Sequence, residues 1–97
     1  MNPTITIIED NKRGTFELHL DHKVVAKMTF VYAGTTKIII DHTEVNPEHN
    51  GKGYGKLLMQ KAIAFATEKE IKIIPLCPFA KSYFDKHPEE NSILFTN

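Results

Sequence analysis

The sequence predicts an α/β protein of the α+β kind, in which a mixed, mostly antiparallel sheet carries two helices. Three observations lead to this fold class. Apolar residues alternate with polar ones through much of the first 45 residues, which is typical of half-buried strands. Residues 53–69 instead repeat apolar residues at helical spacing. A short apolar run at 71–76 then follows. We therefore expect strands first, then a helix, one more strand and a second helix.

The alternation assigns the early strands. Ile5 and Ile7 alternate with polar neighbours, as do the apolar residues of 16–20, and a turn is expected at 11–14. The pair Asp21 and His22 predicts a tight hairpin turn into a strand over 23–32. One face of that strand is expected to hold Val24, Ala26, Met28, Phe30 and Tyr32. After a turn at 33–34, the isoleucine-rich residues 35–45 predict a central strand.

The second half of the chain predicts a crossover connection. The helix over 53–69 is followed by a short buried strand at 71–76, so the two strands that flank the helix should run parallel. A second short helix should begin at Pro78, since proline is favoured at the first helical position. Its apolar residues are Phe79, Tyr83 and Phe84.

Length and composition narrow the class of protein. The 97 residues predict a single domain, 1–97. Twelve Lys and Arg balance twelve Asp and Glu, so we expect neither nucleic acid nor an anionic membrane as a partner. No apolar stretch reaches the roughly 18 residues of a membrane helix, and no signal-peptide pattern stands at the start. The single cysteine cannot form an internal disulfide, which suits a reducing compartment, and a cytoplasmic location is expected.

Residues 45–56 are the most informative segment. Three alternate glycines, Gly51, Gly53 and Gly55, lie between the central strand and the long helix. Backbone without Cβ atoms can approach a ligand closely, and the first-turn N–H groups of a helix point at whatever lies before it. The segment therefore predicts a cradle for a phosphate or pyrophosphate.

Two familiar phosphate loops do not match this spacing. Walker A needs four residues between its glycines and then Lys with Ser or Thr, whereas three residues separate Gly51 from Gly55 and Leu57 follows Lys56. The dinucleotide fingerprint needs a third glycine three positions after the second, where Lys56 stands instead.

The remaining pattern resembles the pyrophosphate loop of the GNAT acyltransferase superfamily, which reads Gln or Arg, two residues, Gly, one residue, then Gly or Ala. Asn50, Gly53 and Gly55 fall on these positions, with Asn50 in place of Gln or Arg. The segment Pro-Leu-Cys-Pro-Phe-Ala at 75–80 resembles that of very short, single-domain GNAT-like proteins. The resemblance runs from about residue 35 to residue 88.

This resemblance implies a GNAT-like acyl-CoA N-acyltransferase fold with acetyl-CoA as the cofactor. It also implies that amides near Val45 polarise the thioester carbonyl, while the glycine loop holds the pyrophosphate. Lys52 and Lys56 are expected to add positive charge near the phosphates; the alternative is that they are ordinary solvated lysines at the helix start. The expected binding residues are Val45, Asn50, Gly51, Lys52, Gly53, Tyr54, Gly55 and Lys56.

Two side chains are candidates for the chemistry. Cys77 precedes Pro78, so it should lie at or near a helix N-cap, where the helix dipole stabilises a thiolate; the alternative is a small buried apolar residue. His42 lies near the end of the central strand, beside the gap where the resemblance places the pantetheine arm, and could be a general base. Its alternative is a strand histidine bonded to a carbonyl or to Glu44. The histidines show no metal-ligand spacing, so no metal site is expected.

The usual superfamily acid is missing from its position. Many members carry Asn, two residues, Ala, three residues, Tyr after this strand, and alignment on Ala80 puts Cys77 at the Asn and Phe84 at the Tyr. Tyr83 is one residue out of register. The acid is therefore expected to be Cys77 or a water molecule, unless Cys77 is a nucleophile that accepts the acyl group first.

The predicted function is transfer of an acetyl group from acetyl-CoA to an amine. The alternatives are a CoA-binding module without catalysis, acting as a sensor or partner-binding protein, and a protein that binds another nucleotide. The sequence leaves the acceptor open among polyamines, protein amino groups, amino sugars and small metabolites, and it leaves the oligomeric state open.

Overall fold

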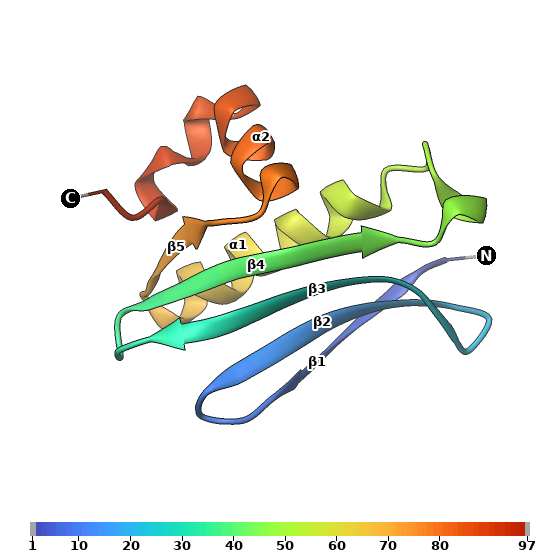
Figure 1. Cartoon of the computed structure of the whole chain (residues 1–97), viewed down its shortest axis with the longest axis horizontal. Coiled ribbons are helices and arrows are strands. Elements are labelled where there is room, and N and C mark those ends of the chain that lie inside the picture. Colours follow the sequence, from blue (N-terminus) through green and yellow to red (C-terminus); the bar gives the residue numbers. More distant parts are fainter. Residues whose placement is uncertain (1, 97) are drawn as a thin grey trace.

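A five-stranded sheet lies against one long helix in the computed structural model, which describes residues 2–96 (Figure 1). The strands follow one another across the sheet in chain order, with antiparallel pairing up to the fourth and parallel pairing between the last two. This confirms the predicted fold class. In chain order the elements are β1 (Thr4–Glu9), β2 (Arg13–Leu20), β3 (Lys23–Ala33), β4 (Lys37–Val45), η1 (Pro47–His49), α1 (Tyr54–Lys69), β5 (Lys72–Pro75), α2 (Pro78–Lys86) and η2 (Pro88–Ile93).

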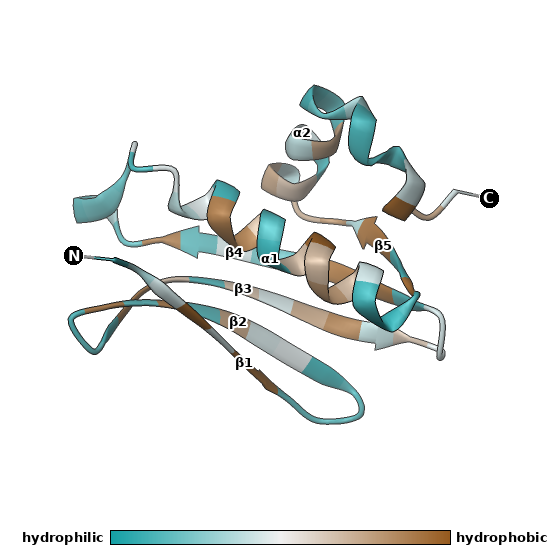
Figure 2. Ribbon diagram, turned by 180° about the vertical axis from the view of Figure 1, so that it is seen from behind, coloured by the Kyte–Doolittle hydropathy of each residue, from teal (hydrophilic) through white to brown (hydrophobic). Residues whose placement is uncertain are grey.

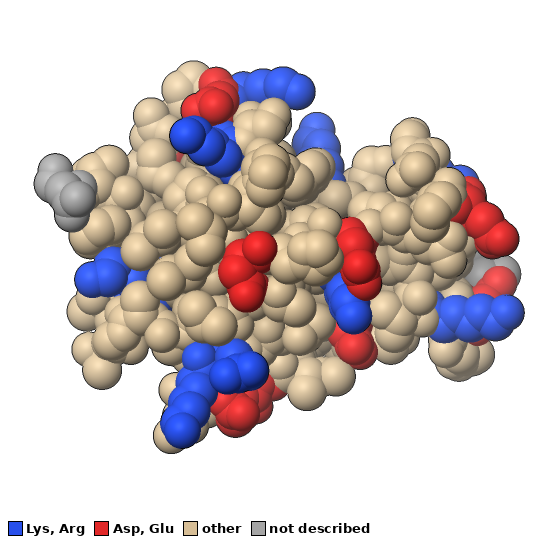
Figure 3. Space-filling model, in the orientation of Figure 1, with Lys and Arg blue, Asp and Glu red and all other residues tan. Residues whose placement is uncertain are grey.

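Helix α1 connects β4 to β5 and covers one face of the sheet, so it lies behind the strands in Figure 1 and in front of them in Figure 2. The opposite face carries interspersed positive and negative side chains (Figure 3). None of the helices within residues 2–96 combines the length and the apolar content needed to cross a membrane.

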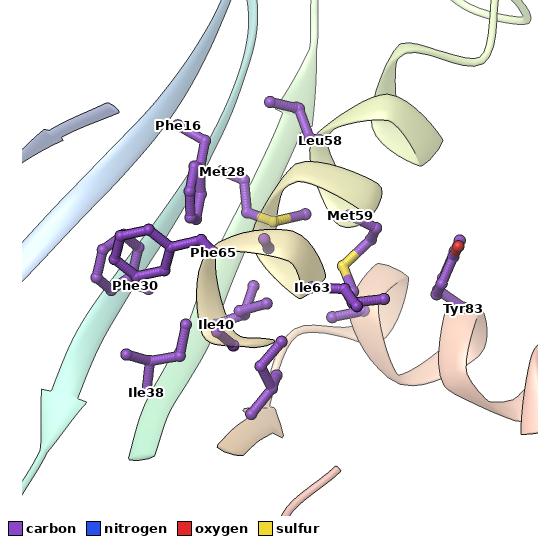
Figure 4. Close-up of a cluster of buried hydrophobic side chains, with 14 of the residues drawn as sticks. Phe16, Met28, Phe30, Ile38, Ile40, Leu58, Met59, Ile63, Phe65 and Tyr83 are labelled. Atoms are coloured by element: carbon purple, nitrogen blue, oxygen red, sulfur yellow. The ribbon is translucent and has the colours of Figure 1, made fainter. Parts of the chain in front are cut away.

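Three phenylalanines form the centre of the core between the sheet and α1 (Figure 4). The rings of Phe16 and Phe30 lie 5.1 Å apart, and Phe65 of α1 lies 5.4 Å and 5.5 Å from them. Such separations are within the favourable range for aromatic pairs. Nearer the amino terminus of α1, Leu58 and Met59 are fully buried in the same core. This packing fixes the first turns of α1 against the sheet, next to the loop that leaves β4.

An irregularity in β3 changes one predicted core position. Strict alternation places Val24 on the same face as Ala26, but the pairing register between β2 and β3 shifts at Leu18 and His19. An extra residue in one strand moves every later side chain to the other face. Val25 is consequently buried, and Val24 is 45% exposed.

The chain after α2 returns to the free edge of β5. Leu94 forms an isolated parallel bridge with Ile73, and the N–H of Phe95 donates to the carbonyl of Ile73 at 2.9 Å. The Lys37 ammonium lies 4.7 Å from the centre of the Phe95 ring, a cation–π distance. The last described residues thus cover an edge that would otherwise be open.

Candidate functional site

The glycine loop adopts the conformation that its sequence predicts. Gly51 and Gly53 have φ values of 82° and 80°, in the left-handed region, and a Cβ at either position would meet nothing within 4 Å. Backbone conformation, rather than lack of space, therefore calls for glycine at both positions.

The loop ends at the amino terminus of α1. Gly53 is the N-cap and no side chain caps this end, while the first intrahelical bond runs from the N–H of Leu57 to the carbonyl of Gly53. The three preceding helix amides, at 54–56, cannot reach an intrahelical carbonyl. The first turn also contains no acidic residue. These amides and the positive end of the helix dipole favour an anion.

A shallow groove of about 410 Å³, here called the loop groove, lies beside these amides. Its lining combines the end of β4, the glycine loop, the first turn of α1 and one residue of α2. The lining residues are Thr43, Val45, His49, Asn50, Gly51, Gly53, Tyr54, Gly55, Lys56 and Phe79. Of the predicted binding residues, all but Lys52 line this groove. Lys52 lies at its margin, where its Nζ is 3.1 Å from Nδ1 of His49.

Gly55 is required because of space, whereas Gly51 and Gly53 are required because of their backbone conformation. Its backbone is not left-handed, but a Cβ there would lie 2.7 Å from the Cζ atom of Phe79. The missing side chain lets the Phe79 ring of α2 lie against the start of α1. That ring remains 40% exposed, and it forms an apolar wall of the loop groove.

The strands beside the loop groove diverge. The parallel pairing of β4 with β5 ends at Ile40 and Pro75, although β4 continues to Val45. The N–H groups of Leu76 and Cys77 both donate to the carbonyl of Ile40 at 3.0 Å, and the chain then turns into α2. The last residues of β4 consequently have no parallel neighbour.

Cys77 is the N-cap of α2, as predicted. Its Sγ accepts a hydrogen bond from the N–H of Ala80 at 3.4 Å and lies 3.4 Å from Oγ1 of Thr43. The residue is 6% exposed and does not itself line the loop groove. Thr43 does line it, so this residue links the groove to the sulfur.

The structure does not bring His42 to the loop groove. Strict alternation from Ile38 and Ile40 would place His42 on the helix side, but the register between β3 and β4 shifts between Thr29 and Phe30 and leaves Asp41 as an extra residue. His42 and Thr29 are partners in the ladder, and Thr43 pairs with the buried Met28.

Thr43 therefore takes the helix side and His42 the opposite face. There Nε2 of His42 lies 3.4 Å from Oε2 of Glu44, whose other carboxylate oxygen lies 3.3 Å from Nζ of Lys27. His42 and then Lys27 lower the pKa of Glu44, which is ionised at neutral pH. This contact with Glu44 matches the alternative to a general base that the sequence left open for His42. A role for His42 as a base remains a prediction, and it would have to act from that face.

The tyrosine near the usual acid position also lies elsewhere. Tyr83 is buried, and its ring stacks on His87 with the ring centres 4.0 Å apart. Burial, followed by Glu90 and Glu89, raises the pKa of Tyr83. Neither Tyr83 nor Phe84 lines the loop groove.

Three residues that line the loop groove were not among the predicted binding residues: Thr43, His49 and Phe79. Thr43 could be found only by knowing the bulge at Asp41, which no local pattern signals. Phe79 was assigned to α2 but not to the groove, and its contact with Gly55 depends on how the two helices pack. Across residues 2–96, His, Cys, Asp and Glu side chains form no group of three or more that could hold a metal ion.

Comparisons with known proteins agree with the fold. A family model described as GCN5-related N-acetyl-transferase matches residues 15–93. The protein NATD1 of Xenopus tropicalis is 29% identical over 92 residues, covering 91% of this chain and 84% of that protein.

Solved structures include a GCN5-like protein from Staphylococcus aureus, with a TM-score of 0.71 and 28% identity over 95% of this chain and 89% of that one. A GNAT family acetyltransferase from Elizabethkingia anophelis, determined with acetyl-CoA bound, has a TM-score of 0.65 at 12% identity. It covers 79% of this chain and 53% of that one, and this likeness shows the fold alone.

Proposed function

Since this chain belongs to the GCN5-related N-acetyltransferase family, we propose that it binds acetyl-CoA in the loop groove and transfers the acetyl group to an amine. One observation carries this proposal. Two left-handed glycines present the free amides of the first turn of α1 to a groove that Thr43 also lines, and Thr43 contacts the only thiol of the chain. A pyrophosphate and a thioester at the two ends of one ligand match this arrangement.

The loop residues 50–56 would hold the pyrophosphate. Their contribution is mainly main-chain N–H groups, because Gly51 and Gly53 have no side chain and the helix start is uncapped. Lys56 lines the groove and Lys52 lies at its margin, so both ammonium groups add positive potential near the phosphates. Phe79 would pack against the apolar part of the carrier.

Acetyl-CoA would supply an acetyl thioester, whose carbonyl carbon exchanges its sulfur for the nitrogen of an amine. Main-chain amides near Val45 would polarise that carbonyl. Cys77 has two alternative roles in this reaction, general acid or nucleophile. As an acid it gives its proton to the departing thiolate and regains one from the amine. As a nucleophile its sulfur forms a bond to the acetyl carbon while the bond to the CoA sulfur breaks, and its proton goes to the departing CoA thiolate. The acetyl group then passes to the amine nitrogen, whose proton returns to the Cys77 sulfur.

A thermal-shift assay with acetyl-CoA, CoA and ATP in separate samples tests the binding. A ligand at a hundredfold excess over its Kd stabilises the folded state by about 2.7 kcal/mol. For a domain of this size that is on the order of 10 °C in Tm. We expect such a rise with acetyl-CoA and CoA but not with ATP, and equal or absent shifts would contradict the proposal.

Intact-mass analysis after incubation with acetyl-CoA distinguishes the two roles of Cys77. An acetyl adduct on the parent protein that is absent from Cys77→Ala supports the nucleophile. Release of CoA that requires an added amine, without an adduct, supports direct transfer. A protein that binds acetyl-CoA and releases no CoA with any amine of a broad panel would instead be a binding module.

A further inference from the structure

His49 lines the loop groove but has no part in the function proposed so far. It is the last residue of η1, where two hydrogen bonds fix the backbone. The N–H of His49 donates to the carbonyl of Asn46 at 2.8 Å, and the side chain of Asn46 accepts from the N–H of Glu48 at 3.0 Å. The imidazole lies beside the ring of Tyr54, with the ring centres 5.9 Å apart. The backbone that carries this imidazole is therefore held in place beside the groove.

Lys52 determines which ring nitrogen of His49 carries the proton. The Nζ atom of Lys52 lies 3.1 Å from Nδ1 of His49. An ammonium group can only donate, so Nδ1 is the acceptor of this hydrogen bond and carries no proton. In a neutral imidazole the other ring nitrogen then carries it. Nε2 of His49 is consequently an N–H donor, and it has no hydrogen-bond partner within residues 2–96.

The surroundings of this donor favour an anion with several oxygens. Among the described residues, the lining of the loop groove includes no Asp or Glu, and it includes Lys56. The Lys52 ammonium has two further protons to donate after its bond to Nδ1. The free amides at the start of α1 lie on the same groove. A phosphate group can accept from several of these donors at once, and a hydrogen bond to an ionised acceptor is about twice as strong as a neutral one.

We infer that His49 binds a phosphate group of the ligand through its Nε2–H, and that Lys52 is the positioning residue that keeps the proton on this nitrogen. The glycine pattern begins at Asn50, so this side-chain contact is additional to the main-chain cradle that the pattern implies. The inference rests on the proposed function, because the phosphate belongs to the CoA carrier. Two parts of CoA have the required chemistry, namely the diphosphate and the 3′-phosphate of the ribose.

Titration calorimetry of the full chain with CoA tests the contact. His49→Gln keeps an N–H donor on a planar side chain, whereas His49→Phe keeps a ring beside Tyr54 and removes the donor. We expect His49→Phe to weaken CoA binding about tenfold, the effect of one hydrogen bond to a charged group, and His49→Gln to stay within about threefold of the parent. His22→Phe, in the turn between β2 and β3, should match the parent. The inference is overturned if His49→Phe binds CoA like the parent, or if both His49 variants weaken binding equally.

The same titrations with 3′-dephospho-CoA identify which phosphate His49 contacts. A loss in His49→Phe with both ligands assigns the diphosphate. A loss with CoA alone assigns the 3′-phosphate.

The ¹⁵N shifts of the ring nitrogens, measured without ligand at about pH 8, above the usual titration range of histidine, test the role of Lys52. These shifts separate a bare ring nitrogen from a protonated one, and the parent protein should show the Nε2–H form of His49. Lys52→Met should give a mixture of the two forms. Lys52→Arg keeps a donor at that position, and Lys56→Met removes a neighbouring charge only, so both should retain the Nε2–H form. An Nδ1–H form in the parent, or an unchanged form in Lys52→Met, would overturn the positioning role.

Inorganic pyrophosphate as a second probe separates this inference from the proposed function. A parent protein that binds CoA, with no loss in His49→Phe, overturns only the His49 contact. A parent protein that binds CoA no more tightly than pyrophosphate, with the same loss of both in His49→Phe, overturns the CoA carrier and leaves a phosphate site at His49. A parent protein that binds neither probe overturns both.

Discussion

The Thr43 hydroxyl lies 3.4 Å from the Cys77 sulfur and connects the end of β4 to the N-cap of α2. The two hydrogen bonds of the sulfur are not equivalent. The Ala80 N–H can only donate, so the sulfur is always the acceptor of that bond. A threonine hydroxyl can donate or accept, so Thr43 can accept from a thiol and donate to a thiolate. Thr43 can consequently stay bonded to Cys77 in both protonation states.

The first prediction concerns that hydroxyl. Thr43→Val keeps the shape and removes the hydrogen bond, whereas Thr43→Ser keeps the hydroxyl. A bond to a charged group contributes about 1.5–3 kcal/mol, so alkylation of Cys77 by iodoacetamide at neutral pH should slow by roughly tenfold in Thr43→Val. Thr43→Ser should stay within about twofold of the parent. Equal rates in Thr43→Val and the parent protein would show that the hydroxyl does not assist the thiolate.

The second prediction separates loop geometry from stability. Gly53 and Gly34 both have left-handed φ, of 80° and 69°, and both have open space where a Cβ would stand. Gly34 lies in the turn between β3 and β4, outside the loop groove. Alanine in this conformation costs about 1–2 kcal/mol, so each substitution should lower Tm by roughly 5–15 °C.

The response to acetyl-CoA should differ between the two variants. Gly34→Ala should retain the full ligand-induced rise in Tm, and Gly53→Ala should lose most of it because its loop amides move. A full rise in Gly53→Ala would mean that the loop does not hold the diphosphate.

The third prediction concerns stability at high pH. The Tyr32 hydroxyl donates to Oε1 of Glu9 at 2.5 Å, and burial, followed by Glu9, raises the pKa of Tyr32 to about 12. An unfolded tyrosine titrates near 10. Between about pH 10 and about pH 12 the folded state therefore holds more protons than the unfolded state, so the free energy of unfolding falls as pH rises.

Urea unfolding across this pH window, with ultraviolet titration of the phenolates, measures the effect. Tyr32→Phe should unfold with a shallower pH dependence and lose one titration near pH 12. Glu9→Gln should lower the titration midpoint of Tyr32 only in part, because burial is the larger cause. An unchanged pH dependence in Tyr32→Phe would assign the effect to other groups, such as Tyr83.

The fourth prediction concerns the turn between β2 and β3. Asp21 and His22 both have positive φ, of 53° and 66°, as a two-residue hairpin turn requires. Glycine suits the second position better than histidine. His22→Gly should therefore stabilise the protein by about 0.5 kcal/mol, after its larger entropy in the unfolded chain is subtracted. His22→Ala should not raise the free energy of unfolding. Urea denaturation of both variants measures this free energy.

Local patterns in the sequence determined the order and type of the elements. Glycine at 51 and 53, a helical repeat after them, and Cys-Pro before a short apolar helix are signals that need no distant partner. The loop conformation and the N-cap role of Cys77 were predictable for that reason. The family resemblance of the same two segments agrees with the family match over residues 15–93.

Tertiary structure alone decided which side chains meet at the site. The extra residue at Asp41 turns Thr43 toward the groove and His42 away from it, and its position depends on pairing with β3 and on burial of Ile38, Ile40 and Met28. The side chains of a strand alternate with period two, so one inserted residue reverses every later assignment. Phe79 reaches Gly55 because α2 packs beside α1, a contact set by the core and not by any neighbour in the chain.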